Sequence, residues 1–133
     1  MTSLGLVVSR FNRPITEGME AAATEAAEAR GATIVATTRV PGAYDTPLAA
    51  DRLARRDDVD AVAVLGAIVT GDTGHDQIIA DAAAKGLTDV SLSRDKPVAL
   101  GITGPGMTAE EARGRVDYGA SAVESAIDMV EAL

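Results

Sequence analysis

The sequence of 133 residues contains no cysteine and no tryptophan, and it has only one phenylalanine, two tyrosines and one histidine. The lack of cysteine excludes disulfides, thiol nucleophiles and thiolate metal sites, and a single histidine leaves a poor ligand set for a metal ion. No apolar run approaches the roughly 18 residues that span a membrane, and no basic start precedes an apolar segment. We therefore expect a cytoplasmic protein without a metal site.

Lysine is also scarce, with two lysines among 12 basic residues against 20 acidic residues, which gives a net charge of −8. A protein that binds nucleic acid through phosphate contacts needs the opposite charge, so no nucleic-acid partner is expected. An acid excess with little lysine is typical of adaptation to high salt. Ordinary variation in a soluble protein is the alternative, because net charge determines solubility and not fold.

The apolar residues, 47% of the chain, include 26 alanines. This apolar fraction excludes a disordered chain, and the length predicts a single domain over residues 1–133. A core with so little aromatic filling is expected to gain part of its stability from contacts between subunits.

Short apolar runs alternate with segments of helical periodicity along the whole chain. Strands are expected at residues 4–9, 33–40, within 59–68 (most clearly 61–65) and 97–103. Helices are expected from Pro14 to a stop at Gly31, from an N-cap at Thr46 to about Arg56, from about Gly74 to Lys85 with Gly86 as the stop, and from a capping box at Thr108 and Glu111 to the C-terminus, with a break near Gly114 or Gly119.

This alternation predicts an α/β fold with three layers, in which a flavodoxin-like four-stranded parallel sheet has helices on both faces. The expected strands are continuous apolar runs, as in sheets buried on both sides. Ligands of such sheets bind at the carboxyl ends of the strands. The loops at residues 9–13, 41–46, 66–75 and 103–107 should therefore share one edge.

The first two of these loops carry candidate ligand-binding residues. Phe11 follows the first strand and could stack on a flat heterocycle, although it could instead pack under the first helix as a hydrophobic staple. In the second loop, Gly42 lets the backbone approach a ligand closely, and Asp45 can accept hydrogen bonds from hydroxyl groups. Plain turn and capping chemistry is the alternative for this loop.

The third loop is neither a Walker loop nor a dinucleotide fingerprint. Its backbone amides and Thr73 precede a helix and form a candidate anion site, although the Asp72 carboxylate opposes an anion there. His75 begins the helix and suits proton transfer near neutral pH, with a surface or capping histidine as the alternative. Arg113 and Arg115 could each bind a phosphate, or could lie on a solvated helix face.

Five segments occur in a defined order along the chain: RFN, VPGAYDTP, LGAIVTGDTGHD, KPVALGITGPGMT and RVDYG. With these segments in this order, the sequence resembles over almost its whole length the lumazine synthase (6,7-dimethyl-8-ribityllumazine synthase) family, particularly its archaeal branch. The resemblance implies a transferase of riboflavin biosynthesis that condenses 5-amino-6-(D-ribitylamino)uracil with 3,4-dihydroxy-2-butanone 4-phosphate. The products are the lumazine, phosphate and water, and no metal or organic cofactor is implied.

The resemblance also implies roles for individual residues. His75 is the acid–base residue, and the RVDYG segment assigns a phosphate role to Arg115 while leaving Arg113 as a helix residue. Asp45 stands where many members carry Glu, and Asp72 stands where bacterial members usually have a small residue. The remaining roles are stacking on the pyrimidine by Phe11, binding of the ribityl chain by Ala43, Tyr44 and Asp45, backbone contacts to the ring by Ala67, Ile68 and Val69, a border of the aromatic site at Leu100, and phosphate binding by Asp72 and Thr73.

The family implies a homopentamer whose active sites lie between adjacent subunits, and some members assemble twelve pentamers into an icosahedral capsid of 60 subunits. We expect the pentamer here and leave the capsid and a functional link to riboflavin synthase open. Two alternatives remain at this point. One is an archaeal-type riboflavin synthase, which uses two lumazine molecules, and the other is a non-catalytic flavodoxin-like binding or shell protein.

Overall fold

The computed structural model describes residues 1–70 and 74–133, which form one parallel sheet and its covering helices. All neighbouring strands are parallel, in the order β2-β1-β3-β4. The elements in chain order are β1 (Ser3–Ser9), α1 (Arg13–Ala29), β2 (Thr33–Val40), a 3₁₀ turn η1 (Ala43–Asp45), α2 (Thr46–Ala54), β3 (Ala61–Ala67), α3 (His75–Arg94), β4 (Val98–Thr103), α4 (Ala109–Arg113) and α5 (Tyr118–Ala132).

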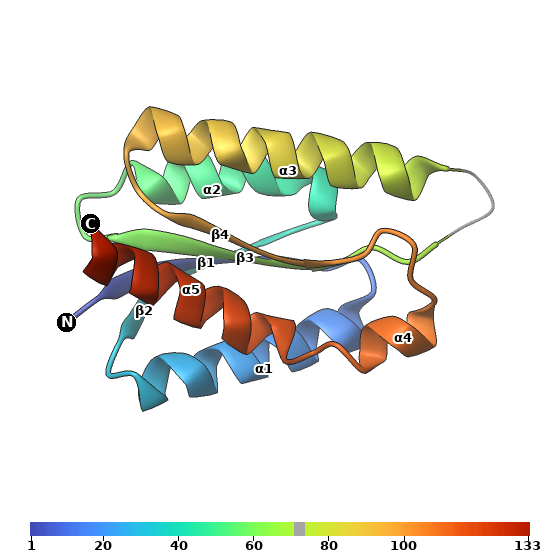
Figure 1. Ribbon diagram of the computed structural model, residues 1–133, viewed down its shortest axis with the longest axis horizontal. Coiled ribbons are helices and arrows are strands. Elements are labelled where there is room, and N and C mark those ends of the chain that lie inside the picture. Colours follow the sequence, from blue (N-terminus) through green and yellow to red (C-terminus); the bar gives the residue numbers. More distant parts are fainter. Residues whose placement is uncertain (71–73) are drawn as a thin grey trace.

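The helices cover both faces of this sheet, which confirms the predicted three-layer arrangement. Figure 1 shows α2 and α3 on one face and α1 and α5 on the other. Because the strands are parallel, the loops that follow β1, β3 and β4 gather at the end of the sheet opposite the two chain termini (Figure 1). This end is where ligands bind in open α/β sheets.

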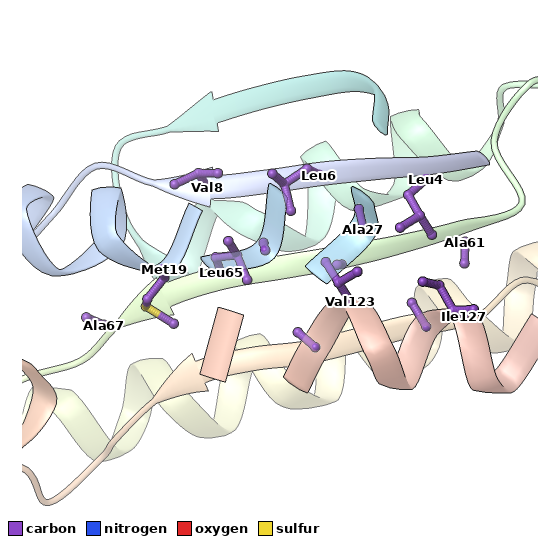
Figure 2. Packing of buried hydrophobic residues seen from close by; sticks show 14 of the residues in the cluster. Leu4, Leu6, Val8, Met19, Ala27, Ala61, Leu65, Ala67, Val123 and Ile127 are labelled. Carbon is purple, nitrogen blue, oxygen red and sulfur yellow. The ribbon is translucent and has the colours of Figure 1, made fainter. Parts of the chain in front are cut away.

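Each face of the sheet buries its own apolar cluster. One cluster lies toward α1 and α5, where Figure 2 labels Leu4, Leu6, Val8, Met19, Ala27, Ala61, Leu65, Ala67, Val123 and Ile127. The other lies toward α2 and α3 and includes Val7, Leu53, Val62, Val64 and Leu87. The buried residues of both clusters are aliphatic apart from Met19, and eight of the 16 in the first cluster are alanines. Small side chains let helices approach the sheet closely, so packing depends on a precise fit of backbone against backbone.

The third helix differs from its prediction. Gly86 was expected to end it, but α3 continues for two further turns to Arg94. The residue that follows the helix, Asp95, has a positive φ of 55°. A Cβ on Gly86 would lie 2.9 Å from Pro47 Cγ, so the glycine lets α3 approach the start of α2. Although α3 has 20 residues, no helix within the described ranges is both long and apolar enough to cross a lipid bilayer.

The second strand is present at the predicted residues, but it is not a continuous buried run. It lies at the edge of the sheet, and its residues alternate between exposed and partly buried positions. Leu4 pairs with Ile34 and Gly5 with Ala36, so Val35 is an extra residue that interrupts the register. An edge strand has one neighbour and incomplete helix cover, which explains its alternation and its polar residues.

The segment after the fourth strand follows its prediction closely. The Thr108 side chain accepts a hydrogen bond from Glu111 N at 3.1 Å, and the Glu111 carboxylate accepts one from Thr108 N at 3.2 Å. This capping box begins α4, which ends at the predicted break beside Gly114. The chain then re-enters a helix at Tyr118, so Gly119 lies inside α5 and does not break it.

An ion-pair network joins the two helices on the α2–α3 face. The Asp51 carboxylate accepts hydrogen bonds from Arg94 Nε at 2.7 Å and from Arg55 Nη2 at 2.6 Å. These guanidinium groups lower the pKa of Asp51, with the Arg94 hydrogen bond as the largest cause. A lowered pKa means that the network stabilises the fold above the ordinary aspartate range near pH 4, and that this stabilisation is lost as the pH falls through the range.

Candidate active site

The loop after β1 holds Phe11 away from the core. The amide of Phe11 donates to Pro41 O at 2.9 Å, which fixes the loop against the end of β2. The next residue, Asn12, has a φ of 63°, and its side chain donates to Ala67 O at 2.9 Å, which ties the same loop to the end of β3. Asparagine tolerates this left-handed conformation better than most residues. Phe11 consequently remains 70% exposed, so it is not a hydrophobic staple under α1.

The loop after β2 forms a tight turn that presents Tyr44. The Asp45 carboxylate accepts a hydrogen bond from Gly42 N at 3.0 Å, and the Thr46 hydroxyl donates to Ala43 O at 2.7 Å. Thr46 was predicted as the N-cap of α2, but it is the first residue of that helix and is buried. Its hydroxyl fastens the turn to the helix instead of capping it, which leaves Tyr44 on the surface and 65% exposed.

These loops border a cavity of about 350 Å³, which we call the Phe11 cavity. A pocket of this volume is at the lower end of those that hold small molecules. Its lining residues come from these two loops, from the end of β3 with the two residues that follow it, and from the start of α3: Phe11, Gly42, Ala43, Tyr44, Ala67, Ile68, Val69, His75, Asp76 and Ile79. The structure therefore brings together His75 and six of the eight predicted substrate-binding residues. Of the other two, Asp45 lies beside Tyr44 without lining the cavity.

Some backbone groups at the end of β3 already form hydrogen bonds within the chain. Ala67 O accepts the hydrogen bond from Asn12, and Ile68 N donates to Thr103 O at 2.8 Å. Among the described residues, the backbone groups of Val69 make no such hydrogen bond. Val69 is therefore the best placed of the three predicted residues to offer its main chain to a ring.

The cavity is suited to proton transfer. Among the described residues that line it, none is a serine, threonine, cysteine or lysine, and the side chains that can carry a proton are those of Tyr44, His75 and Asp76. His75 is exposed at the first position of α3, where the unpaired amides of the helix also favour an anion. Apolar walls with two exposed aromatic rings suit a flat heterocycle.

Asp76 and Ile79 line the cavity without having been predicted. The Asp76 carboxylate accepts hydrogen bonds from Gly106 N at 3.3 Å and from the Thr70 hydroxyl at 3.5 Å, so it joins the loops that follow β3 and β4. The sequence does contain a signal for Ile79, which lies one helical turn after His75 and so on the same face. Asp76 carries only the weaker signal of an acid in the first turn of a helix.

Leu100 and Arg115 lie outside the Phe11 cavity. Leu100 is on the edge strand β4, is 55% exposed, and borders two other hollows, one of about 240 Å³ beside α5 and one of about 160 Å³ beside α3. We call the larger one the Leu100 hollow, and it is lined by Ala99, Leu100, Tyr118, Ser121, Ala122 and Ser125. Arg115 adjoins it through Tyr118, whose hydroxyl accepts a hydrogen bond from Arg115 Nη1 at 2.9 Å. The two remaining predicted phosphate residues, Asp72 and Thr73, lie outside the described residues.

The fold and the cavity define a flavodoxin-like α/β protein with a small-molecule pocket at the carboxyl ends of its parallel strands. A family model described as 6,7-dimethyl-8-ribityllumazine synthase matches residues 2–133, and the chain belongs to this family.

Curated relatives with the same name agree over the full length. The relative from Halobacterium salinarum is 66% identical over 133 residues, which cover 100% of both chains. The relative from Halorubrum lacusprofundi is 65% identical and covers 100% of this chain and 99% of its own. The relative from Methanocaldococcus jannaschii is 50% identical over 100% of this chain and 94% of its own. The similarity to relatives from halophilic archaea agrees with the salt adaptation expected from the acid excess.

Proposed function

We propose that residues 1–133 act as one lumazine synthase domain, which condenses 5-amino-6-(D-ribitylamino)uracil with 3,4-dihydroxy-2-butanone 4-phosphate to 6,7-dimethyl-8-ribityllumazine. The observation that carries this proposal is the Phe11 cavity, because it gathers His75 and two exposed aromatic rings at the ligand-binding edge of a full-length family member. We assign no metal or organic cofactor to this reaction.

In this proposal the pyrimidine stacks on Phe11, which the loop hydrogen bonds hold at the rim of the cavity. Ala43, Tyr44 and Asp45 bind the ribityl chain, and the free oxygen of the Asp45 carboxylate is available to accept from its hydroxyl groups. The main chain of Ala67, Ile68 and Val69 borders the ring, with Val69 making the polar contact. Leu100 lies outside this cavity within one chain, so in this proposal a neighbouring chain supplies the Leu100 that packs beside the aromatic ring.

The phosphate is bound in this proposal by Asp72, Thr73 and Arg115. Asp72 is the unfavourable member of this set, because a carboxylate repels a phosphate. The Arg115 guanidinium offsets that repulsion and binds two phosphate oxygens in a fork geometry.

The chemistry requires orientation and one proton shuttle. The aryl amine attacks the ketone of the butanone and forms an imine, with loss of water. A proton is then removed from C3 of the butanone unit, and phosphate leaves from C4. The enol that results tautomerises to a new carbonyl at C3, which condenses with the ribitylamino nitrogen, again with loss of water. His75 accepts and returns protons in these steps. Holding two substrates side by side can lower the barrier by roughly 7–11 kcal/mol at best, so the residual catalysis without His75 should be substantial.

We further propose that the enzyme is a homopentamer, either free or in a shell of 60 subunits, and that each active site combines two chains. Within one chain, the Phe11 cavity and the Leu100 hollow share no lining residue. Phe11 and Tyr44 in the cavity and Leu100 in the hollow are nevertheless exposed, and the family resemblance implies that all three contact the substrate. A head-to-tail ring would bring the two regions together, because the edge strand β4 of one chain, with its Leu100, would lie against the Phe11 cavity of the next chain.

A mixing experiment tests the shared site. Equal amounts of His75→Ala and Arg115→Ala chains are unfolded together and reassembled, and lumazine formation is measured at low butanone phosphate. If each site takes His75 from one chain and Arg115 from its neighbour, about one site in four contains both native residues. The mixture should then exceed the mean activity of the two variants reassembled separately. Activity equal to that mean would place the complete site within one chain.

The reaction itself is tested by incubating the wild-type protein in high salt with both substrates and recording lumazine absorbance and fluorescence. Lumazine formation supports the proposal. A folded, oligomeric protein that makes no product contradicts it, and lumazine is then offered alone. Riboflavin formed from lumazine alone would indicate a riboflavin synthase, and binding without turnover would indicate a binding or shell protein.

A further inference from the structure

Tyr118 lies where a helix begins beside the proposed phosphate ligand. It is the first residue of α5, and its ring packs partly buried against the apolar cluster beneath α1 and α5. The amide of Tyr118 donates to Arg115 O at 3.0 Å, so the backbone of these two residues forms one turn. Because the core packs against the Tyr118 ring and the turn fixes its backbone, the ring can restrain the neighbouring Arg115 side chain.

The Tyr118 side chain contacts the Arg115 guanidinium in two ways. Its hydroxyl accepts a hydrogen bond from Arg115 Nη1 at 2.9 Å, and the guanidinium carbon lies 5.8 Å from the centre of the ring. Among the described residues, the Nε and Nη2 atoms of Arg115 have no hydrogen-bond partner. A guanidinium held in this way keeps a two-donor edge free, which matches the spacing of two phosphate oxygens.

We propose that Tyr118 is a positioning residue that orients Arg115 for the phosphate group of the butanone substrate. This inference rests on the proposed function and on the phosphate role of Arg115. Its physical basis is pre-organisation, because a long arginine side chain loses considerable rotamer freedom when it binds. A guanidinium already restrained by Tyr118 has less of that freedom to lose.

The test compares Tyr118→Phe with wild type, because this substitution removes the hydroxyl and retains the ring. We expect the KM for butanone phosphate to rise roughly threefold to tenfold, the factor that corresponds to one lost hydrogen bond. The inhibition constant of inorganic phosphate should rise in parallel. The kcat and the KM for ribitylaminouracil should remain within about twofold, because a hydrogen bond to Arg115 acts only on the phosphate. A merely structural role would instead change all of these constants together.

A double-mutant cycle with Arg115→Ala identifies the route of the effect. Arg115→Ala alone should raise the KM for butanone phosphate roughly 10- to 100-fold, and adding Tyr118→Phe should then have almost no further effect. Arg113→Ala is the matched control, because Arg113 is an exposed arginine two residues away and should leave this KM unchanged.

Each outcome of this cycle has a distinct meaning. A wild-type protein that forms no lumazine overturns the proposed function. If the wild type is active but its KM is unaffected by Tyr118→Phe, the inference is overturned and the proposed function stands. If its KM is unaffected by Arg115→Ala, the inference and the phosphate role of Arg115 are both overturned, and only the proposed reaction stands. Additive effects of the two substitutions also overturn it, because they would show that Tyr118 acts independently of Arg115.

Discussion

His75→Ala is expected to slow lumazine formation by roughly 10²- to 10⁴-fold without abolishing it, which is the usual range for the loss of one general acid–base group. The structure places His75 at the start of α3, on the wall of the Phe11 cavity. Removing the imidazole takes away the proton shuttle but leaves the aromatic rim and the phosphate ligands in place. The substrates are therefore still brought together, and that orientation supplies the remaining rate.

The measurement is the kcat of the variant under saturating substrates, with circular dichroism and oligomer mass recorded to show that the protein is folded and assembled. Added imidazole should restore part of the lost rate, because a small base can enter the space that the side chain leaves. His75→Gln provides a second variant that fills the space without a titrating group, and it should be as slow as His75→Ala. Complete loss of activity in a folded, assembled His75→Ala protein would contradict the proposed role, as would an unchanged kcat.

The sequence predicted the sheet and one side of the site because both depend on local pattern. Strands β1, β2 and β3 end at Ser9, Val40 and Ala67, within the predicted ranges, and parallel topology places their carboxyl ends at one edge. Phe11 lies two residues after β1 and His75 eight residues after β3, so their meeting in one cavity follows from topology. The staple alternative at Phe11 is wrong because the loop holds its ring 70% exposed, and the stacking role stays a prediction.

The features that the sequence did not predict depend on contacts between distant segments. Gly86 carries the local signal of a helix end, yet the approach of Pro47 makes it an interior residue of α3. Asp76 looks like an ordinary residue of a first helical turn, and its link to Gly106 exists only in the folded chain. The separation of Leu100 from the Phe11 cavity was not predicted either, because a resemblance assigns residues to a site without giving their positions in the folded chain.

The second large effect is expected in the fold, where Gly119→Ala should lower the free energy of unfolding by about 3 kcal/mol or more. A Cβ on Gly119 would lie 2.0 Å from Met19 O, and the nearby Met19 carbonyl carbon would be at 2.8 Å. Both are backbone atoms of α1, so no side-chain rotation can relieve the overlap. Helices α1 and α5 must move apart, and the apolar cluster between them and the sheet loses its close packing.

Gly114→Ala is the matched control, because Gly114 has a φ of −78° and a Cβ there would meet its nearest neighbour, Glu111 O, at an ordinary 3.4 Å. Thermal unfolding should show a Tm about 10 °C lower or more for Gly119→Ala, and a Tm close to wild type for Gly114→Ala. Equal melting temperatures for the two variants would show that α1 and α5 do not approach as closely as the structure indicates.

The Gly119→Ala substitution should also affect activity, since α5 begins with Tyr118. Any shift of that helix displaces the support of Arg115, so Gly119→Ala should weaken phosphate binding at temperatures where the protein is still folded.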